Sequence, residues 1–302
     1  MKRPAQAGNW FACGLTAGLA TLFRPESALL LACLGLVLAL REGSRRAWKP
    51  ICKGAGLMAA GLVLALFPWT LRNALTLRTF QPLAPVYAQD QGEQVPVGYI
   101  DWCKTWLWRY SDVERYLWPV GSSDLPADSL PGGAGDNPAQ RQEELGLIRR
   151  HNEENDNLSP TDDREFESIA SERRRAHPLR YAVTLPLLRS LAMWFTPRVE
   201  ILPLAGRLLP LAQACKDDWA DFSVTLLLFL LNAGYAALAF WGAARPLDSA
   251  QFWGPFAIAA TIAVRTGFFA CFTFPEPRYV LEVYPEVIAL GALALSAHPR
   301  RR

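Results

Sequence analysis

Phe67-Pro68-Trp69-Thr70-Leu71-Arg72-Asn73 is the stretch at which the chain changes from apolar to polar. It ends an uncharged run that begins at Gly54, and it precedes the only long polar region, which lasts until about Pro178. Tryptophan is favoured at the headgroup level of a bilayer, and an arginine at that level can reach lipid phosphates. The stretch therefore predicts a membrane helix that ends at Pro68-Trp69, with Arg72 at its mouth.

The hydrophobic residues are gathered in blocks. They make up 51% of the 302 residues. Blocks of about 18 or more apolar residues are typical of membrane helices, because a hydrocarbon layer of about 30 Å needs about 20 residues in a helix. We expect a mainly α, polytopic helical membrane protein with one extracytoplasmic insert of mixed or irregular structure.

Charge is distributed unevenly along the chain. Residues 90–178 hold 18 acidic and 10 basic side chains, whereas the remainder holds 10 acidic and 21 basic ones. An acidic block beside basic helix flanks indicates the two sides of a membrane. The basic residues form no stripe interleaved with aromatic residues, so we expect no nucleic-acid partner.

The basic loops set the expected orientation. Basic residues gather at 41–53, and by the positive-inside rule this loop faces the cytoplasm. Residues 54–71 then cross to the outer side. The clearest span is Phe222–Ala244, 23 residues without a charge, and it is followed by Phe252–Phe274 and by a last helix to about Ala297. The basic C-terminal tail lies on the same side as the first loop, which is an independent check.

These assignments divide the chain into four segments in a membrane of the bacterial inner (cytoplasmic) type, with the second segment on the periplasmic or outer side. The segments are N-terminal membrane helices with an Arg-Pro elbow and a basic loop (1–71), an acidic domain containing tryptophans (72–178), interfacial or broken helices (179–218) and C-terminal membrane helices (219–302).

The N-terminal segment contains two short apolar stretches. Trp10–Phe23 imitates a signal peptide, but no small-residue cleavage site follows it, so we interpret it as a helix of the mature protein. Arg24-Pro25 separates it from Ser27–Leu40 and breaks the helix. The two stretches fit either a hairpin or a broken membrane passage that lines a polar cavity.

The acidic domain has local signals of its own. Tryptophans cluster in its first half, and Gly121–Pro138 has the composition of a loop with little intrinsic order. Ser159 begins a predicted helix with acidic residues in its first turn and an apolar face at Phe166, and His177-Pro178 ends it. Leu179–Phe195 is interrupted by Pro186 and Arg189, so we expect a broken or interfacial helix there.

Cysteine and histidine predict no metal site. None of the six cysteines makes a CxxC pair, and the three histidines are scattered. Cys103 and Cys215 both lie in polar segments and are the one candidate pair, although free thiols are the preferred interpretation.

Four arginines lie in or at the ends of apolar helices: Arg24, Arg72, Arg265 and Arg278. On the expected topology Arg72 and Arg278 share the outer mouth, where guanidinium groups can bind a phosphate or pyrophosphate bidentately. The alternative for any single arginine is snorkelling to lipid headgroups. Glu282 and Glu286, one turn apart, are candidates to neutralise Arg265 or Arg278.

Several residues of the acidic domain are candidates for contacts with a sugar or an acceptor. Asp101, Asp112 and Glu114 lie near the tryptophan cluster and suit sugar contacts or proton transfer, although a solvated acidic face is the alternative. Trp102 and Trp106 either stack on sugar rings or pack the domain against the bilayer.

Three motifs resemble those of the GT-C superfamily, bacterial membrane glycosyltransferases related to the dolichyl-phosphate-mannose protein mannosyltransferases. GLTAGLATLFRP at 14–25 resembles the helix "GLaxGLAxLtRP", and FPWTLRN at 67–73 is similar to the helix exit "xPWxxRN". Glu276-Pro277-Arg278-Tyr279, before Tyr284-Pro285, looks like the entry "EpRYxxpxyP" to a late helix. The resemblance covers nearly the whole chain in the right order.

The resemblance implies transfer of a sugar from a polyprenyl-phosphate donor to an acceptor on the outer membrane face. Arg24, Arg72, Arg278 and Tyr279 are the matching positions for the lipid phosphate, and Glu276 lies beside them for contacts with the sugar or acceptor. The family's catalytic carboxylate follows its first membrane helix, and no matching acidic pair occurs here. The chain therefore resembles a C-terminal portion, either a truncated product or half of a split enzyme, or a non-catalytic subunit or scaffold that displays an acidic domain.

Overall fold

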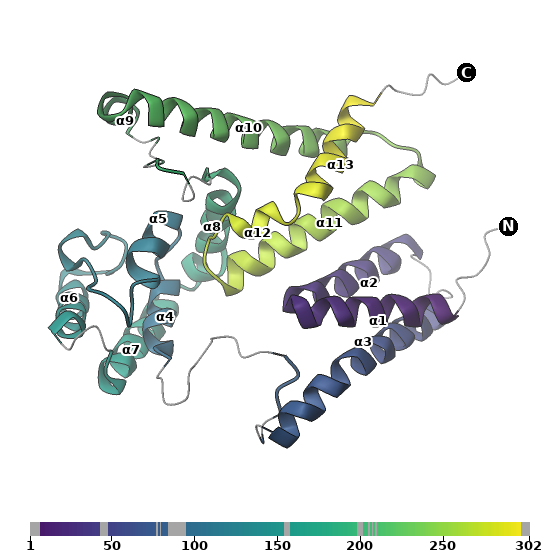
Figure 1. Ribbon diagram of the computed structural model, residues 1–302, viewed down its shortest axis with the longest axis horizontal. Helices are drawn as coiled ribbons and strands as arrows, with labels where there is room; N and C mark the ends of the chain where they lie inside the picture. The colour runs from purple at the N-terminus through teal and green to yellow at the C-terminus, as the bar shows by residue number, and fades with distance from the viewer. Residues whose placement is uncertain are drawn as a thin grey trace. The chain divides into compact units, whose positions relative to one another are not determined.

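The computed structural model describes residues 7–42, 48–76, 78, 80–83, 95–153, 158–197, 202–204, 206, 208 and 210–296. In these residues the chain is built of helices and loops without a strand (Figure 1). It forms two compact units. Unit 1 comprises Met1–Ala88 and Gly242–Arg265, and unit 2 comprises Gln89–Trp241 and Thr266–Arg302.

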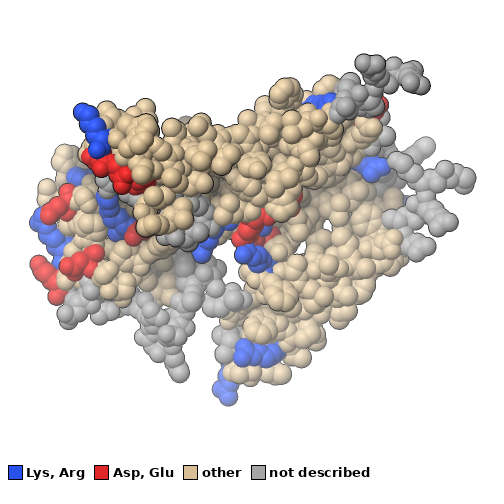
Figure 2. All heavy atoms as spheres, turned by 45° about the horizontal axis from the view of Figure 1, so that its top comes forward, with Lys and Arg blue, Asp and Glu red and all other residues tan. Residues whose placement is uncertain are grey.

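Three helices are long and apolar enough to cross a membrane. The stretches are Lys49–Thr76 in α3 (Trp48–Thr76), the whole of α10 (Trp219–Ala244) and Gln251–Phe272 in α11 (Ser249–Phe272). Each coincides with a span expected from the sequence, which supports a membrane protein. Figure 2 shows charged side chains gathered over the acidic domain and at the α9 end of α10, whereas the rest of α10 presents uncharged residues.

The expected end of the first long helix at Pro68-Trp69 is wrong. Helix α3 continues through Pro68 to Thr76, so Arg72 lies in the last turns of the helix rather than beyond it. A proline removes one backbone donor and disturbs the turn before it, but apolar membrane helices tolerate this loss. The Asn73 side chain then donates to the carbonyl of Gln81 at 2.8 Å, which holds the chain where it leaves the helix.

Unit 1 is organised by close packing of α1 (Ala7–Phe23) against α3. A Cβ atom placed on Gly14 would lie 1.9 Å from the carbonyl oxygen of Met58, and one on Gly61 would lie 2.4 Å from that of Phe11. Small residues let membrane helices approach through their backbones. The glycines therefore set the distance between α1 and α3.

The break at Arg24-Pro25 is confirmed. Helix α1 ends at Phe23, the 3₁₀ turn η1 (Pro25–Ala28) follows, and α2 (Leu29–Glu42) begins there. Arg24 has an extended backbone, as a residue before proline prefers. Helix α2 returns to contact both α1 and α3, which is the hairpin arrangement (Figure 1).

Residues 89–178 of the acidic domain belong to unit 2, and in its described residues helices alternate with turns and loops. Its longer elements are α4 (Val97–Lys104), α6 (Pro138–Glu153) and α7 (Pro160–Ala176). Shorter turns complete it: α5 (Tyr110–Asp112), the π-helical turn η3 (Val113–Leu117) and the 3₁₀ turn η4 (Ala127–Ser129). Helix α4 packs on α7 around aromatic side chains.

Both predicted ends of α7 are confirmed. The Ser159 hydroxyl accepts from the backbone N–H of Asp162 at 3.1 Å, which is the expected N-cap, and His177 is the C-cap. Phe166 is buried on the predicted apolar face.

Tertiary contacts hold Gly121–Pro138, the loop whose composition predicts little intrinsic order. The Arg141 guanidinium donates to the carbonyls of Leu130 and Pro131 at 2.5 and 2.9 Å. Asn152 forms two hydrogen bonds with the backbone of Leu125. The loop composition supplies no intrinsic order, but α6 holds the loop in place.

The remaining helices of unit 2 follow the acidic domain. The interruptions predicted at Pro186 and Arg189 are not seen: the π-helical turn η5 (Arg180–Thr184) leads into α8 (Leu185–Phe195), which runs through both residues. The later elements are α9 (Leu211–Asp217), α10, the end of α11, α12 (Arg278–Leu281) and α13 (Tyr284–Leu295).

One buried arginine connects these parts of unit 2. Arg189 on α8 is 1% exposed and donates to the carbonyls of Lys104, Leu107 and Ala270 at 2.5, 2.9 and 3.4 Å. Burial lowers the pKa of its guanidinium to about 10, so the group stays charged at neutral pH. The arginine thus joins α8 to the end of α4 and to α11.

We expect Gly14→Ala and Gly61→Ala each to lower the free energy of unfolding by about 1–3 kcal/mol, because the new methyl group must displace a backbone carbonyl. Gly56→Ala is the matched control on α3, since a Cβ there has no atom within 4 Å. Thermal unfolding in detergent measures the effect. Equal midpoints for all three variants would contradict the packing.

Arg189→Met should lower the free energy of unfolding by about 3 kcal/mol, because carbonyls buried with Arg189 lose their charged donor. Arg175→Met, on the exposed side of α7, is the control and should change it by less than about 0.5 kcal/mol. Denaturant titration in detergent, followed by tryptophan fluorescence, compares the two. A loss no larger than that of the control would refute the role of Arg189.

Candidate functional site

Glu276 and Pro277 precede α12 in unit 2, and Arg278 and Tyr279 are the first residues of that helix. The side chain of Arg278 is 58% exposed, and its Nε lies 2.5 Å from Oε2 of Glu276, a carboxylate that is almost buried. The same guanidinium lies over the ring of Tyr279, 5.3 Å from its centroid. Arg278 is therefore a cation that is held from two sides and still open to solvent or lipid.

Tyr279 fixes this segment against α11. Its ring stacks on Phe269 with a centroid distance of 4.0 Å and an interplanar angle of 4°. Tyr279 thus serves as support for Arg278 through packing, as well as being an expected phosphate contact.

An apolar cavity of about 200 Å³ lies among α8, α10, α12 and α13, all in unit 2. Pro277, Val280 and Leu281 line it on the side of the Arg278 segment. Its other lining residues are Met193, Thr196, Pro197, Leu228, Leu231, Asn232, Tyr235 and Tyr284. A hydrocarbon cavity adjoining an exposed arginine segment suits an amphiphile with an anionic head.

Asn232 contributes a polar side chain to the lining of this cavity. Its side-chain nitrogen donates to the carbonyl of Trp194, which joins α10 to α8. Its side-chain oxygen is buried and has no hydrogen-bond partner within the described residues. An occupant of the cavity with a hydroxyl or amide donor would satisfy this oxygen.

In unit 1 the Arg-Pro motif forms a small charge cluster. Oε1 of Glu26 lies 3.6 Å from Nη1 of Arg24 and 3.4 Å from Nη2 of Arg265. Glu26 is mostly buried, whereas more than half of the Arg24 side chain is exposed. Glu26 thus lies at Arg265, and Glu276 lies at Arg278. The pairing of Glu282 or Glu286 with these arginines stays a prediction.

Arg72 makes local contacts on α3. It donates to the side-chain oxygen of Asn73 at 2.9 Å and lies over the ring of Trp69 at 5.3 Å. Arg24 and Arg72 belong to unit 1 and Arg278 to unit 2. The sharing of one mouth by Arg72 and Arg278 therefore stays a prediction.

Two of the acidic residues expected to contact a sugar are ion-paired or buried within the acidic domain. Asp101 lies 3.3 Å from Lys104 and 3.1 Å from Arg174, so it is part of an ion-pair group. Asp112 is buried, and burial raises the pKa of its carboxyl, against the opposing effect of nearby arginines. Glu114 is exposed.

The interpretation of the tryptophans as a sugar platform or a bilayer contact is corrected for Trp102 and Trp106. They are 0% and 5% exposed, and Trp102 packs against Tyr99 and Phe166. A stacking platform needs at least one ring face open to the sugar, and these rings are covered. Tyr99, Trp102 and Trp106 have the spacing of one helical face, which is the sequence signal that could have indicated a core.

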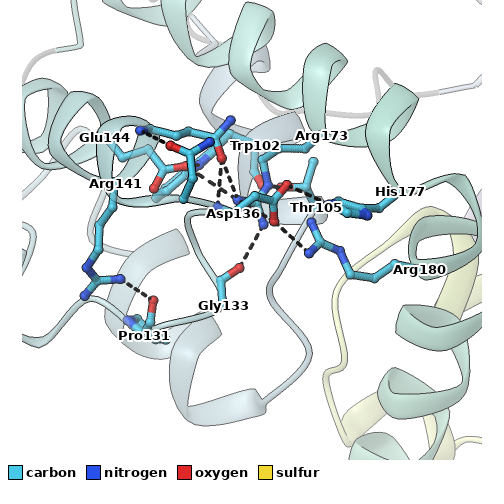
Figure 3. Close-up of polar contacts among 12 residues, drawn as sticks. Trp102, Thr105, Pro131, Gly133, Asp136, Arg141, Glu144, Arg173, His177 and Arg180 are labelled. Atoms are coloured by element: carbon cyan, nitrogen blue, oxygen red, sulfur yellow. Dashed lines mark hydrogen bonds and ion pairs between the residues drawn. The ribbon is translucent and has the colours of Figure 1, made fainter.

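A buried polar network holds the acidic domain together, and the sequence did not predict it (Figure 3). Arg173 on α7 has a fully buried side chain that donates to the Thr105 hydroxyl at 2.9 Å and to the carbonyl of Gly133 at 2.8 Å. It lies 3.3 Å from Asp136 and 3.7 Å from Glu144. Arg173 continues the helical spacing of Phe166, Ile169 and Ala170, which indicated an inward position.

Glu144 on α6 is the most perturbed acid of this network. It is 0% exposed, and its Oε1 accepts from Nε1 of Trp102 at 3.0 Å. Burial raises the pKa of its carboxyl to about 7, although Trp102 and Arg173 oppose the shift. Perturbed acids are common at functional sites, but a carboxyl this covered acts on the fold rather than on a substrate.

The cysteines make no bond. All six are free thiols, and Cys103 is buried in the acidic domain, where burial raises the pKa of its thiol. Within the described ranges no three histidine, cysteine or acidic side chains come together to hold a metal ion.

No protein-family model matches this chain, and neither the curated proteins nor the solved structures contain a match to it.

Trp102→Phe should lower the free energy of unfolding by about 1–3 kcal/mol, because Glu144 loses a buried hydrogen-bond donor. Trp118→Phe, at a half-exposed ring, is the control and should have little effect. Chemical denaturation of the full chain in detergent measures both. If the two variants lose the same stability, Trp102 is not a structural core residue.

Proposed function

We propose that the chain is an integral-membrane glycosyltransferase, or part of one, that transfers a sugar from a polyprenyl-phosphate carrier to an acceptor at the outer membrane face. The observation that carries the proposal is the adjacency of two features in unit 2. Arg278 is exposed and held by Glu276 and Tyr279, and Pro277 and Val280 beside it line an apolar cavity.

The chemistry of a polyprenyl phosphate matches this combination. An isoprenoid chain is a hydrocarbon and gains by leaving water or filling an apolar cavity. The phosphate that departs when the sugar is transferred carries negative charge, which a guanidinium stabilises by charge-assisted hydrogen bonds. Arg278 is the proposed ligand of this phosphate, with Arg24 and Arg72 as further basic positions from the motif resemblance.

The acceptor hydroxyl must lose its proton to a general base, and the motif resemblance implies that this base is a carboxylate. Asp101 is engaged by Lys104 and Arg174, and Asp112 is buried, so neither is assigned this role. Glu276 is bound to Arg278 and is assigned to the donor side of the site. The proposal therefore includes a general base from another segment or from a partner subunit.

The proposed setting is a bacterial inner membrane with the acidic domain on the periplasmic side. The basic loop at 41–53 and the basic tail support this orientation through the positive-inside rule. The proposed partners are membrane lipid and the lipid-linked sugar.

A non-catalytic membrane subunit or scaffold is the second candidate. The specific observation in its favour is the internal pairing of the acidic domain, in which Asp101, Asp136 and Glu144 all face arginines. Such a domain is a stable displayed module without an assigned catalytic acid.

Arg278→Ala should weaken binding of a polyprenyl phosphate to the purified full chain by about tenfold to a hundredfold, corresponding to about 1.5–3 kcal/mol for a hydrogen-bonded charge. Leu231→Trp, which fills the cavity, should weaken it through the hydrocarbon chain. Arg115→Ala, an exposed arginine of the acidic domain, is the control. Binding is measured in nanodiscs by displacement of a fluorescent polyprenyl phosphate.

Transfer is the second measurement, in membranes that contain the products of the complete locus and a polyprenyl-phosphate sugar. Arg72→Ala and Arg278→Ala are both expected to reduce it. If both variants transfer sugar at the normal rate and bind the lipid normally, the phosphate site is refuted. If lipid binding persists but transfer never occurs, the scaffold is the better description.

A further inference from the structure

The carboxyl group of Glu144 has one satisfied and one unsatisfied oxygen. Oε1 accepts from Nε1 of Trp102 and lies 3.7 Å from Nη1 of Arg173. Oε2 is buried and has no hydrogen-bond partner in the part of the chain that the structure describes. An ionised carboxylate shares its charge between both oxygens, so ionisation places charge on an atom without a donor.

A short loop covers this oxygen. A Cβ atom on Gly135 would lie only 2.8 Å from Oε2, which shows how closely residues 131–136 approach it. The loop is held at Gly133 by a hydrogen bond from Arg173, and Asp136 lies 3.3 Å from Arg173 and 2.7 Å from Arg180 (Figure 3). The loop therefore keeps water away from the carboxyl group through contacts that involve the same arginine.

The groups facing Glu144 come from every element packed around it. Trp102 on α4 donates to the carboxyl, Arg173 on α7 favours its ionised form, and so does Arg141 on α6. Asp136 in the loop opposes ionisation. Arg173 is itself shared with Asp136, so its charge is only partly available to Glu144.

We propose that Glu144 is a proton switch for the acidic domain: the protonated carboxyl keeps the 131–136 loop closed over it, and the ionised carboxylate opens the loop to water. The switch goes beyond the proposed glycosyltransferase function and does not depend on it. Opening also loosens the contacts of Arg173 and Arg180 with Asp136, at the junction of α7 with the helices that follow.

The direction of the pH dependence follows from proton linkage. The closed state raises the pKa of Glu144 from 4.5 to about 7, whereas an opened carboxyl regains its ordinary value. The closed loop is therefore fully favoured below pH 4.5, and this advantage is lost as the pH rises through 7. Above pH 7 the ionisation of Glu144 no longer changes the equilibrium between the closed and the open loop.

Hydrogen–deuterium exchange of the full chain in nanodiscs tests the switch, with rates corrected for the intrinsic effect of pH. Protection of the amides at 132–136 should fall by roughly 50-fold between pH 5 and pH 8 in the natural chain. Glu144→Gln keeps an acceptor for Trp102 without the charge, so its protection should be independent of pH. Glu143→Gln, at the exposed neighbour, should behave as the natural chain does.

Two further measurements keep the test decisive. Gly135→Ala places a methyl group against Oε2 and should expose the loop at both pH values. Infrared difference spectroscopy of the natural chain should show a carboxyl band that disappears with a midpoint near pH 7 and is absent in Glu144→Gln. Protection that is independent of pH in the natural chain, or equally dependent in Glu144→Gln, overturns the proposal, and so does a band with a midpoint near 4.5.

Discussion

The N–H donors of a buried guanidinium need hydrogen-bond acceptors within the protein, and this constraint organises unit 2. Arg189 lies inside the protein with carbonyl groups of Lys104, Leu107 and Ala270 around it. Those carbonyls stand where α4 has ended and where α11 is about to end, which are places where a helix leaves acceptors unused. Within unit 2, α4 of the acidic domain, α8 and the end of α11 are thus joined by backbone groups that would otherwise lack donors.

The acidic domain repeats this principle with Arg173. That side chain joins α4, α6, α7 and the 131–136 loop through Thr105, Gly133, Asp136 and Glu144. An excess of acids in the sequence suggested a charged outer face, but several of the acids neutralise buried or half-buried arginines. A buried network is most stable when every polar atom has a hydrogen-bond partner, and Glu144 Oε2 is one buried atom that has none within the described residues. The network that holds the acidic domain together is therefore also the source of its proposed sensitivity to pH.

Features of the proposed glycosyl-transfer site lie where apolar packing meets charge. The stacked rings of Phe269 and Tyr279 hold the Glu276-Arg278 pair at the start of α12, and the adjoining residues line an apolar cavity. The three motifs predicted the arginines, because an arginine at the end of an apolar stretch can be recognised in the sequence. The carboxylates beside them were less visible, since the pairing of Glu26 with Arg265 joins residues far apart in the chain.

The sequence by itself determined the features that depend on neighbouring residues: the three long apolar helices, the break at Arg24-Pro25, and both ends of α7. Apolar length, proline geometry and capping act over a few residues, so they can be read along the chain. The tertiary structure decided the continuation of α3 past Pro68, the burial of Trp102, the order of Gly121–Pro138 and the network around Arg173. These depend on which distant groups meet, because a buried polar or aromatic side chain is stabilised only by partners from other elements.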